Sequence, residues 1–285
     1  MNKKFGVSSF SEVYCLKKVL SVKKAGHCGT LDPIATGVLP IFLNMATKAI
    51  MYLDNKNKEY VAKFKLGVKT DTLDITGKIL QKEKTNVIKK QLDEIVKKFV
   101  GEIEQTPPMF SAVKFKGVAL YKLAREGKVV ERKKRAVKIY RLEVLEFSEF
   151  LQEAKIKVFC SEGTYIRSLV EDIAKELGTF GVLVELTRTN ACGFLLKDSV
   201  TIEKIKELKE EQKLGLVIKP IDTVFKNLKK VVLNEKLSFM FLNGVKILVE
   251  GYFKEQELVR VYGANFFAIA RFEKGLLKPN KILSR

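Results

Sequence analysis

The sequence predicts an α+β protein in which a larger domain, residues 1–225, is followed by a small β-rich domain, residues 226–285. Helix and strand patterns alternate irregularly and lack the β-α-β rhythm of a parallel sheet. Past about residue 225 the pattern changes to short, closely spaced strands. A length of 285 residues fits this division, since about 150 residues per domain is usual.

The composition and net charge indicate what kind of partner the protein binds and which kinds of site it lacks. The chain has 53 Lys and Arg against 33 Asp and Glu, a net charge of +20, which favours nucleic acid or an acidic membrane surface as partner. With 46% apolar residues it can bury a core. There is no apolar run of about 18 residues and no signal-peptide core. One His and four scattered Cys argue against a zinc site or a disulfide framework. We therefore expect a soluble, reduced, cytoplasmic protein.

Four elements are expected in the first hundred residues. A helix is expected over 11–20, because apolar residues recur there at helical spacing and a serine stands at the N-cap position. A glycine-punctuated loop follows over 25–37. Strict alternation predicts a strand over 59–68 with one buried face; the buried set is Tyr60, Ala62, Phe64 and Leu66. An apolar stripe predicts a helix over 87–100, closed by Gly101.

The rest of the larger domain is read in the same way. A short helix over 120–126 ends at Gly127, and lysine-interleaved strands are expected over 137–147 and 154–160. A strongly amphipathic helix is expected over 164–177. A charged stretch at 204–213 leads to a turn at 219–220. The small domain is expected to hold strands over 245–250, 257–262 and 266–272.

The densest motif is G-H-C-G-T-L-D-P at residues 26–33. Its glycines allow a tight loop and close approach to a ligand, and Pro33 biases Asp32 toward extended backbone. A lone carboxylate on such a loop, after Lys23 and Lys24, could be a nucleophile or a general base. It could equally be a surface turn in which Asp32 bonds to backbone. The residues alone leave both interpretations open.

Further motifs follow in order along the chain: G-V-L-P at 37–40, A-T-K at 46–48, K-E-Y at 58–60, T-D-T-L-D-I-T-G at 70–77, Q-T-P-P at 105–108, G-T-Y-I-R-S-L at 163–169 and L-T-R-T at 186–189. Together with residues 26–33, this set resembles the TruB family of tRNA pseudouridine-55 synthases. The resemblance covers residues 2–195, and the tail resembles the PUA-like domain of that family more weakly.

The resemblance implies the pseudouridine-synthase fold, with a mixed, mainly antiparallel central sheet. It implies isomerisation of uridine at position 55 in the T-loop of tRNA, by base flipping and by cleavage and re-formation of the glycosidic bond. The product is an isomer of the substrate, so no cofactor or metal is expected. The implied partner is the tRNA T-arm; we expect a monomer with no obligate protein partner and no membrane.

Three catalytic residues are carried over by the resemblance. Asp32 would attack C1′ of the sugar or remove the 2′ proton, and the sequence does not separate these roles. Tyr60 would stack on the flipped base and meet the proton that leaves C5. Arg167 would keep Asp32 ionised and fix its direction. Without the resemblance, Tyr60 reads as a core residue and Arg167 as a solvated one.

Substrate binding is implied for eight residues. His27 would enter the T-loop and take the space of the extruded base, for which a flat ring is suited. Leu186 would pack in the pocket, and lysines would contact phosphates with a salt-sensitive affinity. The set is His27, Gly29, Thr30, Leu31, Lys48, Lys114, Tyr165 and Leu186.

The chain departs from the family pattern at a few positions. An apolar strand normally precedes N-K-P, but here the chain starts at Met1 and Lys4 replaces the proline, so either the start is shortened or the protein manages without that edge strand. Cys28 stands where threonine is common. Asn44 replaces a glycine, and asparagine tolerates the left-handed backbone that a turn requires.

Three other functions remain open. A non-catalytic tRNA-binding or tRNA-folding module would use the same groove. A general polyanion or membrane binder would depend on charge alone, although no basic amphipathic helix supports it. An H/ACA-guided enzyme would keep the chemistry and change the target, whereas the bacterial-style segment over 107–127 favours stand-alone action.

Overall fold

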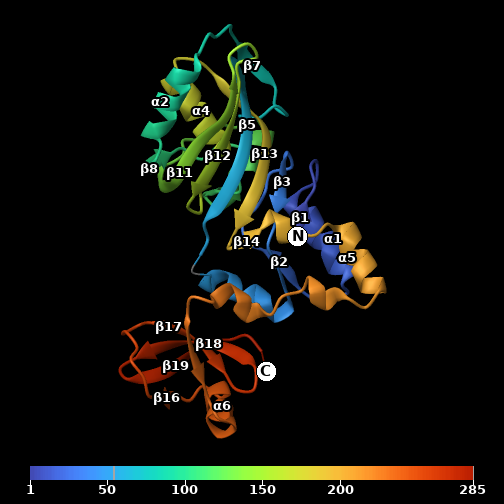
Figure 1. Ribbon diagram of the computed structural model, residues 1–285, viewed down its shortest axis with the longest axis vertical. Coiled ribbons are helices and arrows are strands. Elements are labelled where there is room, and N and C mark those ends of the chain that lie inside the picture. Colours follow the sequence, from blue (N-terminus) through green and yellow to red (C-terminus); the bar gives the residue numbers. More distant parts are fainter. Residues whose placement is uncertain (54, 285) are drawn as a thin grey trace.

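The computed structural model of the protein describes residues 1–53 and 55–284, which form a large sheet with flanking helices and a smaller sheet at the C-terminal end (Figure 1). The elements of the first part of the chain are β1 (Asn2–Lys3), α1 (Ser9–Val19), β2 (Ala25–His27), β3 (Ala35–Val38), β4 (Ile41–Leu43), the 3₁₀ helix η1 (Asn44–Tyr52), β5 (Lys58–Leu66), β6 (Val68–Thr70), β7 (Ile79–Lys82), α2 (Lys89–Lys98), β8 (Gly101–Gln105), β9 (Lys114–Phe115), β10 (Val118–Ala119) and α3 (Leu120–Arg125). Those of the second part are β11 (Arg135–Ser148), β12 (Glu153–Cys160), α4 (Ile166–Glu176), β13 (Gly181–Ala191), β14 (Phe194–Leu195), η2 (Leu196–Asp198), α5 (Ile202–Glu210), η3 (Leu214–Leu216), η4 (Ile221–Phe225), β15 (Lys229–Val232), α6 (Glu235–Leu242), β16 (Ile247–Leu248), β17 (Leu258–Tyr262), β18 (Phe266–Glu273) and β19 (Leu276–Ile282).

The central sheet has eight strands, in the order β1-β3-β13-β5-β12-β11-β8, with β14 paired to β13. β3 and β13 run parallel, and the other neighbouring strands are antiparallel. The prediction of an α+β fold with a mixed, mainly antiparallel sheet is therefore confirmed. β13, which lies beside the centre of the sheet, was not among the predicted strands.

One face of the sheet is buried under α2 and α4. Tyr60, Ala62, Phe64 and Leu66 of β5 are all buried, as their alternation predicts, and they share one apolar cluster with Leu92 of α2 and Leu169 of α4. The intervening lysines of β5, Lys63 and Lys65, instead pair with Glu153 on the opposite face. The two faces of β5 thus have opposite chemistry, as the period of two requires.

Element ends differ from the prediction by about two residues at several places. α1 begins at Ser9 because Ser8 is its N-cap, whose hydroxyl accepts a hydrogen bond from the Ser11 amide. α4 begins at Ile166 because Tyr165 is extended and caps it. The expected loop over 25–37 includes β2 and β3, which is a correction. The charged stretch at 204–213 lies mostly in α5.

A short edge strand, β1, is present at the N-terminus, so of the two alternatives the one without an edge strand was wrong. Asn2 and Lys3 pair with Val38 and Gly37 of β3. The Lys3 side chain is buried, and its ammonium donates to the carbonyls of Lys4 and Val7, each at 2.8 Å. A two-residue strand was missed because it is too short for an alternating pattern.

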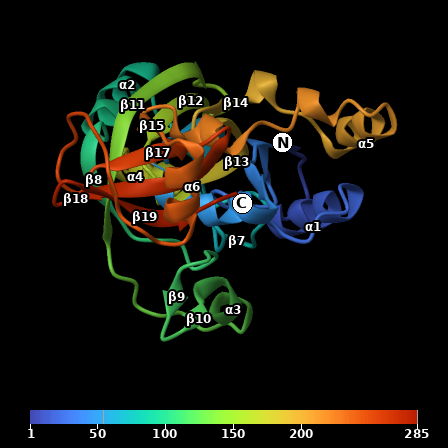
Figure 2. The ribbon, with the colours of Figure 1, turned by 90° about the horizontal axis from the view of Figure 1, so that it is seen from below.

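The C-terminal sheet has the order β15-β17-β18-β19-β16, and α6 packs against it. The strand expected over 245–250 is only β16, and β15 and β19 were not predicted. A separate apolar cluster joins the two parts of the molecule; it includes Cys28, Phe42, Cys192, Phe225, Phe266 and Leu283. The division after residue 225 stays our interpretation. The segment β9-β10-α3 projects away from both sheets (Figure 2).

Candidate active site

The loop between β2 and β3 carries Asp32, and both sides of that residue are fixed. The hydroxyl of Ser9 accepts from the Leu31 amide at 2.8 Å and donates to the Leu31 carbonyl at 2.9 Å. The Asp32 carbonyl accepts from the Ala35 amide at 3.0 Å. Leu31 is itself buried in the core. The carboxylate of Asp32 is therefore presented by backbone that has little freedom to move.

Arg167 pairs with this carboxylate. Its Nη2 lies 2.8 Å from Oδ2 of Asp32, and its side chain is only 4% exposed while that of Asp32 is 35% exposed. The same guanidinium donates to the carbonyls of Thr72 and Phe110, each at 2.8 Å. Read without the family resemblance, Arg167 was a solvated residue, and that interpretation was wrong. The arginine is held by backbone acceptors and so fixes the direction of Asp32.

The pKa of Asp32 reflects opposing effects. Burial raises the pKa of the carboxyl above its ordinary value, Arg167 lowers it, and the neighbouring Asp74 raises it. Arg167 does favour the ionised form, as expected, but the net direction is upward. A carboxylate that is poorly hydrated yet partly open to solvent is a stronger base or nucleophile than one free in water.

Asp74 is an acidic residue near the site that sequence reasoning did not single out. Its side chain is 7% exposed, and its Oδ2 lies 3.9 Å from Nη1 of Arg167. Its other oxygen accepts from the Thr72 hydroxyl at 2.9 Å and from the Thr76 amide at 3.0 Å. The T-D-T-L-D-I-T-G block contained it, but nothing in the sequence told which of the two aspartates turns inward.

Tyr60 lies on the buried face of β5, in the same apolar cluster as Leu31 and Leu186. Burial raises the pKa of its phenol to about 12. The ring is therefore neutral at ordinary pH, so it can stack or hydrogen-bond but does not carry a phenolate. Across the sheet, Tyr60 is paired with Arg188 of β13.

Arg188 is a second residue that sequence reasoning missed. It is fully buried, and it donates to the carbonyls of Val38 at 2.7 Å and Gly29 at 3.0 Å. Gly37 has φ +101°, and a Cβ there would lie 2.3 Å from the Arg188 carbonyl oxygen. Arg188 thus joins β13 to the motif loop. Because arginine is seldom fully buried, its position had no sequence signal beyond the L-T-R-T motif.

His27 and Lys48 come together at a cavity of about 450 Å³ that Gly29 and Cys28 also line. Burial lowers the pKa of His27, so the ring is neutral near pH 7. Its Nδ1 is buried, and it has no hydrogen-bond partner among the described residues. A neutral ring with an unused nitrogen beside exposed lysine is suited to contact a nucleotide.

The remaining predicted residues are more scattered. Leu31 and Leu186 are buried beside Tyr60, and Thr30 is exposed. Tyr165 caps α4, and its amide and carbonyl both bond to the Gln105 side chain. Burial raises the pKa of the Tyr165 phenol. Lys114 is exposed on β9, in the projecting segment of Figure 2, and does not line the cavity beside His27.

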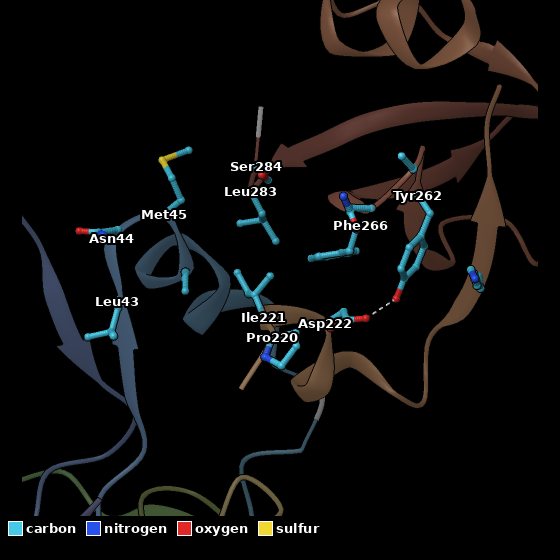
Figure 3. Close-up of a pocket in the computed structure, with 14 residues that line it drawn as sticks. Leu43, Asn44, Met45, Pro220, Ile221, Asp222, Tyr262, Phe266, Leu283 and Ser284 are labelled. Carbon is cyan, nitrogen blue, oxygen red and sulfur yellow. Dashed lines mark hydrogen bonds between the residues drawn. The ribbon is translucent and has the colours of Figure 1, made fainter. Parts of the chain in front are cut away.

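A larger cavity, about 840 Å³, lies at the junction of the two parts. Figure 3 shows the Tyr262 hydroxyl directed at Asp222, to which it donates at 2.6 Å. Of the described residues that line this cavity, none is a predicted site residue. Cavity volume therefore does not identify the candidate site. We place the candidate site at Asp32, where buried charges converge.

Two further properties concern residues 1–53 and 55–284 only. These residues contain no group of three or more His, Cys, Asp or Glu side chains that could hold a metal ion. Among the same residues, no helix is long and apolar enough to cross a membrane.

Comparison with known proteins gives consistent matches. A family model described as TruB family pseudouridylate synthase (N terminal domain) matches residues 17–166, and one described as tRNA pseudouridylate synthase B C-terminal domain matches residues 167–226. Proteins named tRNA pseudouridine synthase B from Francisella tularensis subsp. novicida (strain U112) and Francisella philomiragia subsp. philomiragia are each 42% identical over 293 residues. Those matches cover 100% of this chain and 94% of each relative.

Solved structures are similar in fold. A chain of the structure described as "Crystal Structure of a Cbf5-Nop10-Gar1 Complex" matches with a TM-score of 0.76 and 26% identity, covering 99% of this chain and 83% of that one. A chain of "Structure of H/ACA RNP bound to a substrate RNA containing 2'-deoxyuridine" also has a TM-score of 0.76, at 24% identity, covering 100% and 84%.

Proposed function

Because this chain belongs to the TruB family of pseudouridylate synthases, an enzyme family that isomerises uridine, we propose that its target is the uridine at position 55 in the T-loop of tRNA. The reaction class is that of the relatives named tRNA pseudouridine synthase B, which match over the full length of the chain. The target position follows from the motifs of residues 26–33 and 163–169, which resemble those of the position-55 enzymes.

One observation carries this proposal: a partly exposed carboxylate, Asp32, is held at 2.8 Å by an arginine that is almost fully buried. Opening a glycosidic bond requires a charged group of fixed direction next to the ribose. Arg167 fixes that direction because its other donors are occupied by the Thr72 and Phe110 carbonyls. The same loop carries His27, whose cavity is proposed to receive part of the RNA; Asp32 is not among the described residues that line it.

The proposed chemistry uses this chain's own groups. Asp32 either attacks C1′, so that the C1′–N1 bond breaks and an Asp32–C1′ ester forms, or takes the 2′ proton, so that the base leaves as a C1′–C2′ double bond forms. C1′ then bonds to C5 of the turned base while the ester breaks or the 2′ proton returns, and the proton lost from C5 is balanced by one gained at N1. Tyr60 acts as a neutral phenol, because burial raises its pKa to about 12: its ring stacks on the base and its hydroxyl meets the proton that leaves C5. The product is an isomer of the substrate, so the overall reaction consumes nothing.

Binding is proposed to be stand-alone and electrostatic. A net charge of +20 favours the phosphates of a tRNA T-arm, with an affinity that falls steeply as salt increases. His27 would enter the T-loop, Lys48 and Lys114 would lie against phosphates, and the small β domain would be PUA-like. We expect a monomer that needs no protein partner and acts in the cytoplasm, where tRNA is found.

The test is to incubate the purified protein alone with a tRNA transcript and map pseudouridine by chemical labelling and primer extension. We expect one modified position, 55. A transcript with cytidine at that position is the matched control and should acquire none. A tRNA that is bound but never modified would support the non-catalytic folding module, and modification only when a guide RNA is added would support the H/ACA-guided alternative. Either result would contradict the proposal.

A further inference from the structure

Two buried cysteines meet at the motif loop, to which Cys28 belongs. Sγ of Cys192 donates to Sγ of Cys28 at a distance of 3.0 Å, and both residues are free cysteines. They are 164 positions apart in the sequence, so only the fold brings them together. Cys28 is one of the residues that line the cavity beside His27.

Cys192 also has an unusual backbone. It and Gly193 are the two residues between β13 and β14, and both have positive φ, +54° and +80°. Two-residue hairpin turns of this kind favour asparagine or aspartate before glycine, because other side chains are strained there. A cysteine at this position is locally unfavourable, yet it directs its sulfur at Cys28. Cys28 in turn stands where threonine is common in the family it resembles.

From this geometry we propose that Cys28 and Cys192 are an oxidisable thiol pair, which closes to a disulfide when a peroxide reaches the cavity beside His27. Such a bond would join the loop of Asp32 to the end of β13, the strand that carries Arg188. This chemistry does not depend on the RNA reaction, so it can be tested whether or not position 55 is the target.

The order of the two steps follows from the surroundings of each sulfur. The hydrogen bond from Cys192, with Lys58 and Arg188 nearby, lowers the pKa of the Cys28 thiol, and that same bond raises the pKa of Cys192. Cys28 is therefore the nucleophile, since the thiolate is the reactive form.

The atoms balance as follows. The Cys28 thiolate attacks one peroxide oxygen, the O–O bond breaks, and hydroxide leaves, which takes up the proton first lost by Cys28. The resulting S–OH group is attacked by the Cys192 thiol, an S–S bond forms, and the S–O bond breaks. The departing oxygen takes the Cys192 proton and leaves as water. Two sulfurs are thus oxidised by two electrons, and one peroxide becomes two waters.

The experiment treats the full-length protein with hydrogen peroxide, removes the excess with catalase, and counts free thiols after unfolding. We expect the four thiols to fall to two, with peptide mapping that joins Cys28 to Cys192 and full recovery with dithiothreitol. The oxidised protein should also melt higher, on the order of 5 °C, because the cross-link closes a long loop in the unfolded chain.

Cys192→Asn is the informative variant, because asparagine suits the turn and the protein should fold. It should show no cross-link and no rise in melting temperature with peroxide, and Cys28→Thr should behave alike. Cys160→Ser is the matched control: Cys160 is buried in the apolar cluster of the central sheet, not in that of Cys28 and Cys192, and its thiol donates to the Lys58 carbonyl, so the loss of two thiols should persist. Four free thiols after treatment, or a cross-link that persists in Cys192→Asn, would overturn the proposal.

Discussion

The two sheets of the protein differ in where they place charge. Beside the central sheet, the charged residues Arg188, Lys3, Arg167 and Asp74 are all buried. The buried cluster of the C-terminal sheet is apolar, and a typical ion pair there, Lys229 with Glu257, joins side chains that are 46% and 22% exposed. One region buries its charges, and the other keeps them in water.

We infer from this difference in buried charge that the chemistry takes place beside the central sheet. A buried charge loses hydration and is tolerated only where other groups compensate for it, so a fold that serves stability alone avoids it. Here the compensating groups are backbone carbonyls of Thr72, Phe110, Val38 and Gly29, which belong to the segments around Asp32. The buried charges are thus arranged to fix one loop. Each prediction below pairs a change in this region with a matched change outside it.

The largest difference in turnover is expected between the variants Asp32→Asn and Asp222→Asn. Asparagine at 32 removes the charge that is proposed to open the glycosidic bond, so tritium release from 5-tritiated uridine in tRNA should fall by about 10³-fold or more. Affinity for tRNA should be largely kept. Asp222 accepts a hydrogen bond from Tyr262 at the junction, so its variant should retain turnover within a few-fold. Near-normal turnover in Asp32→Asn would refute the assignment of Asp32.

Arg167→Met should be strongly destabilising. It leaves Asp32 and Asp74 without their cation and two carbonyls without their donor, so we expect a loss of about 3–5 kcal/mol in the free energy of unfolding. Lys229→Met removes an exposed pair and should cost less than about 1 kcal/mol. Urea unfolding measures both. Equal losses would mean that burial of charge does not distinguish the two regions.

Tyr60→Phe should fold and bind tRNA yet lose most of its turnover, because only the hydroxyl is removed from a ring that still packs. Tyr262→Phe makes the same change at the junction, loses the bond to Asp222, and should leave turnover intact. Single-turnover rates with saturating enzyme separate chemistry from binding. A fully active Tyr60→Phe would leave the tyrosine with a packing role alone.

The smallest expected effect is a shift in the pH at which the single-turnover rate falls. Because burial raises the pKa of Asp32 above 3.8, the single-turnover rate should fall, as pH is lowered, at a pH above that value. The sign for stability follows: a raised acid pKa favours the protonated folded state, so stability from this group is present at low pH and lost as pH rises through the raised pKa. Melting temperatures of Asp32→Asn, which lacks this titration, provide the reference. A single-turnover rate that falls only at or below pH 3.8 would contradict the raised pKa of Asp32.

Hydrophobic patterns within single helices and strands predicted part of the fold. The alternation of β5 and the stripe of α4 identified buried faces, because each pattern is repeated within one element. β13 was missed, because charged residues interrupt its sequence and its partners β3 and β5 are far away in the chain. The short β1 had no pattern at all.

The site shows the same limit. The motif over residues 26–33 marked Asp32, but the burial of Arg167 and Arg188 depends on carbonyls supplied by distant segments, and arginine as a residue type indicates exposure. Asp74 and the approach of Cys192 to Cys28 likewise arise from tertiary contacts. Such features become visible only once the strands are in register.

The most direct measurement is a crystal structure of the protein with a T-stem hairpin RNA that carries 5-fluorouridine at position 55. We predict that this nucleotide is turned out of its stack, with the Asp32 carboxylate within about 3.5 Å of its C1′ or C2′, the near-attack distance. A carboxylate directed away from the ribose, or separated from it by protein, would contradict the account.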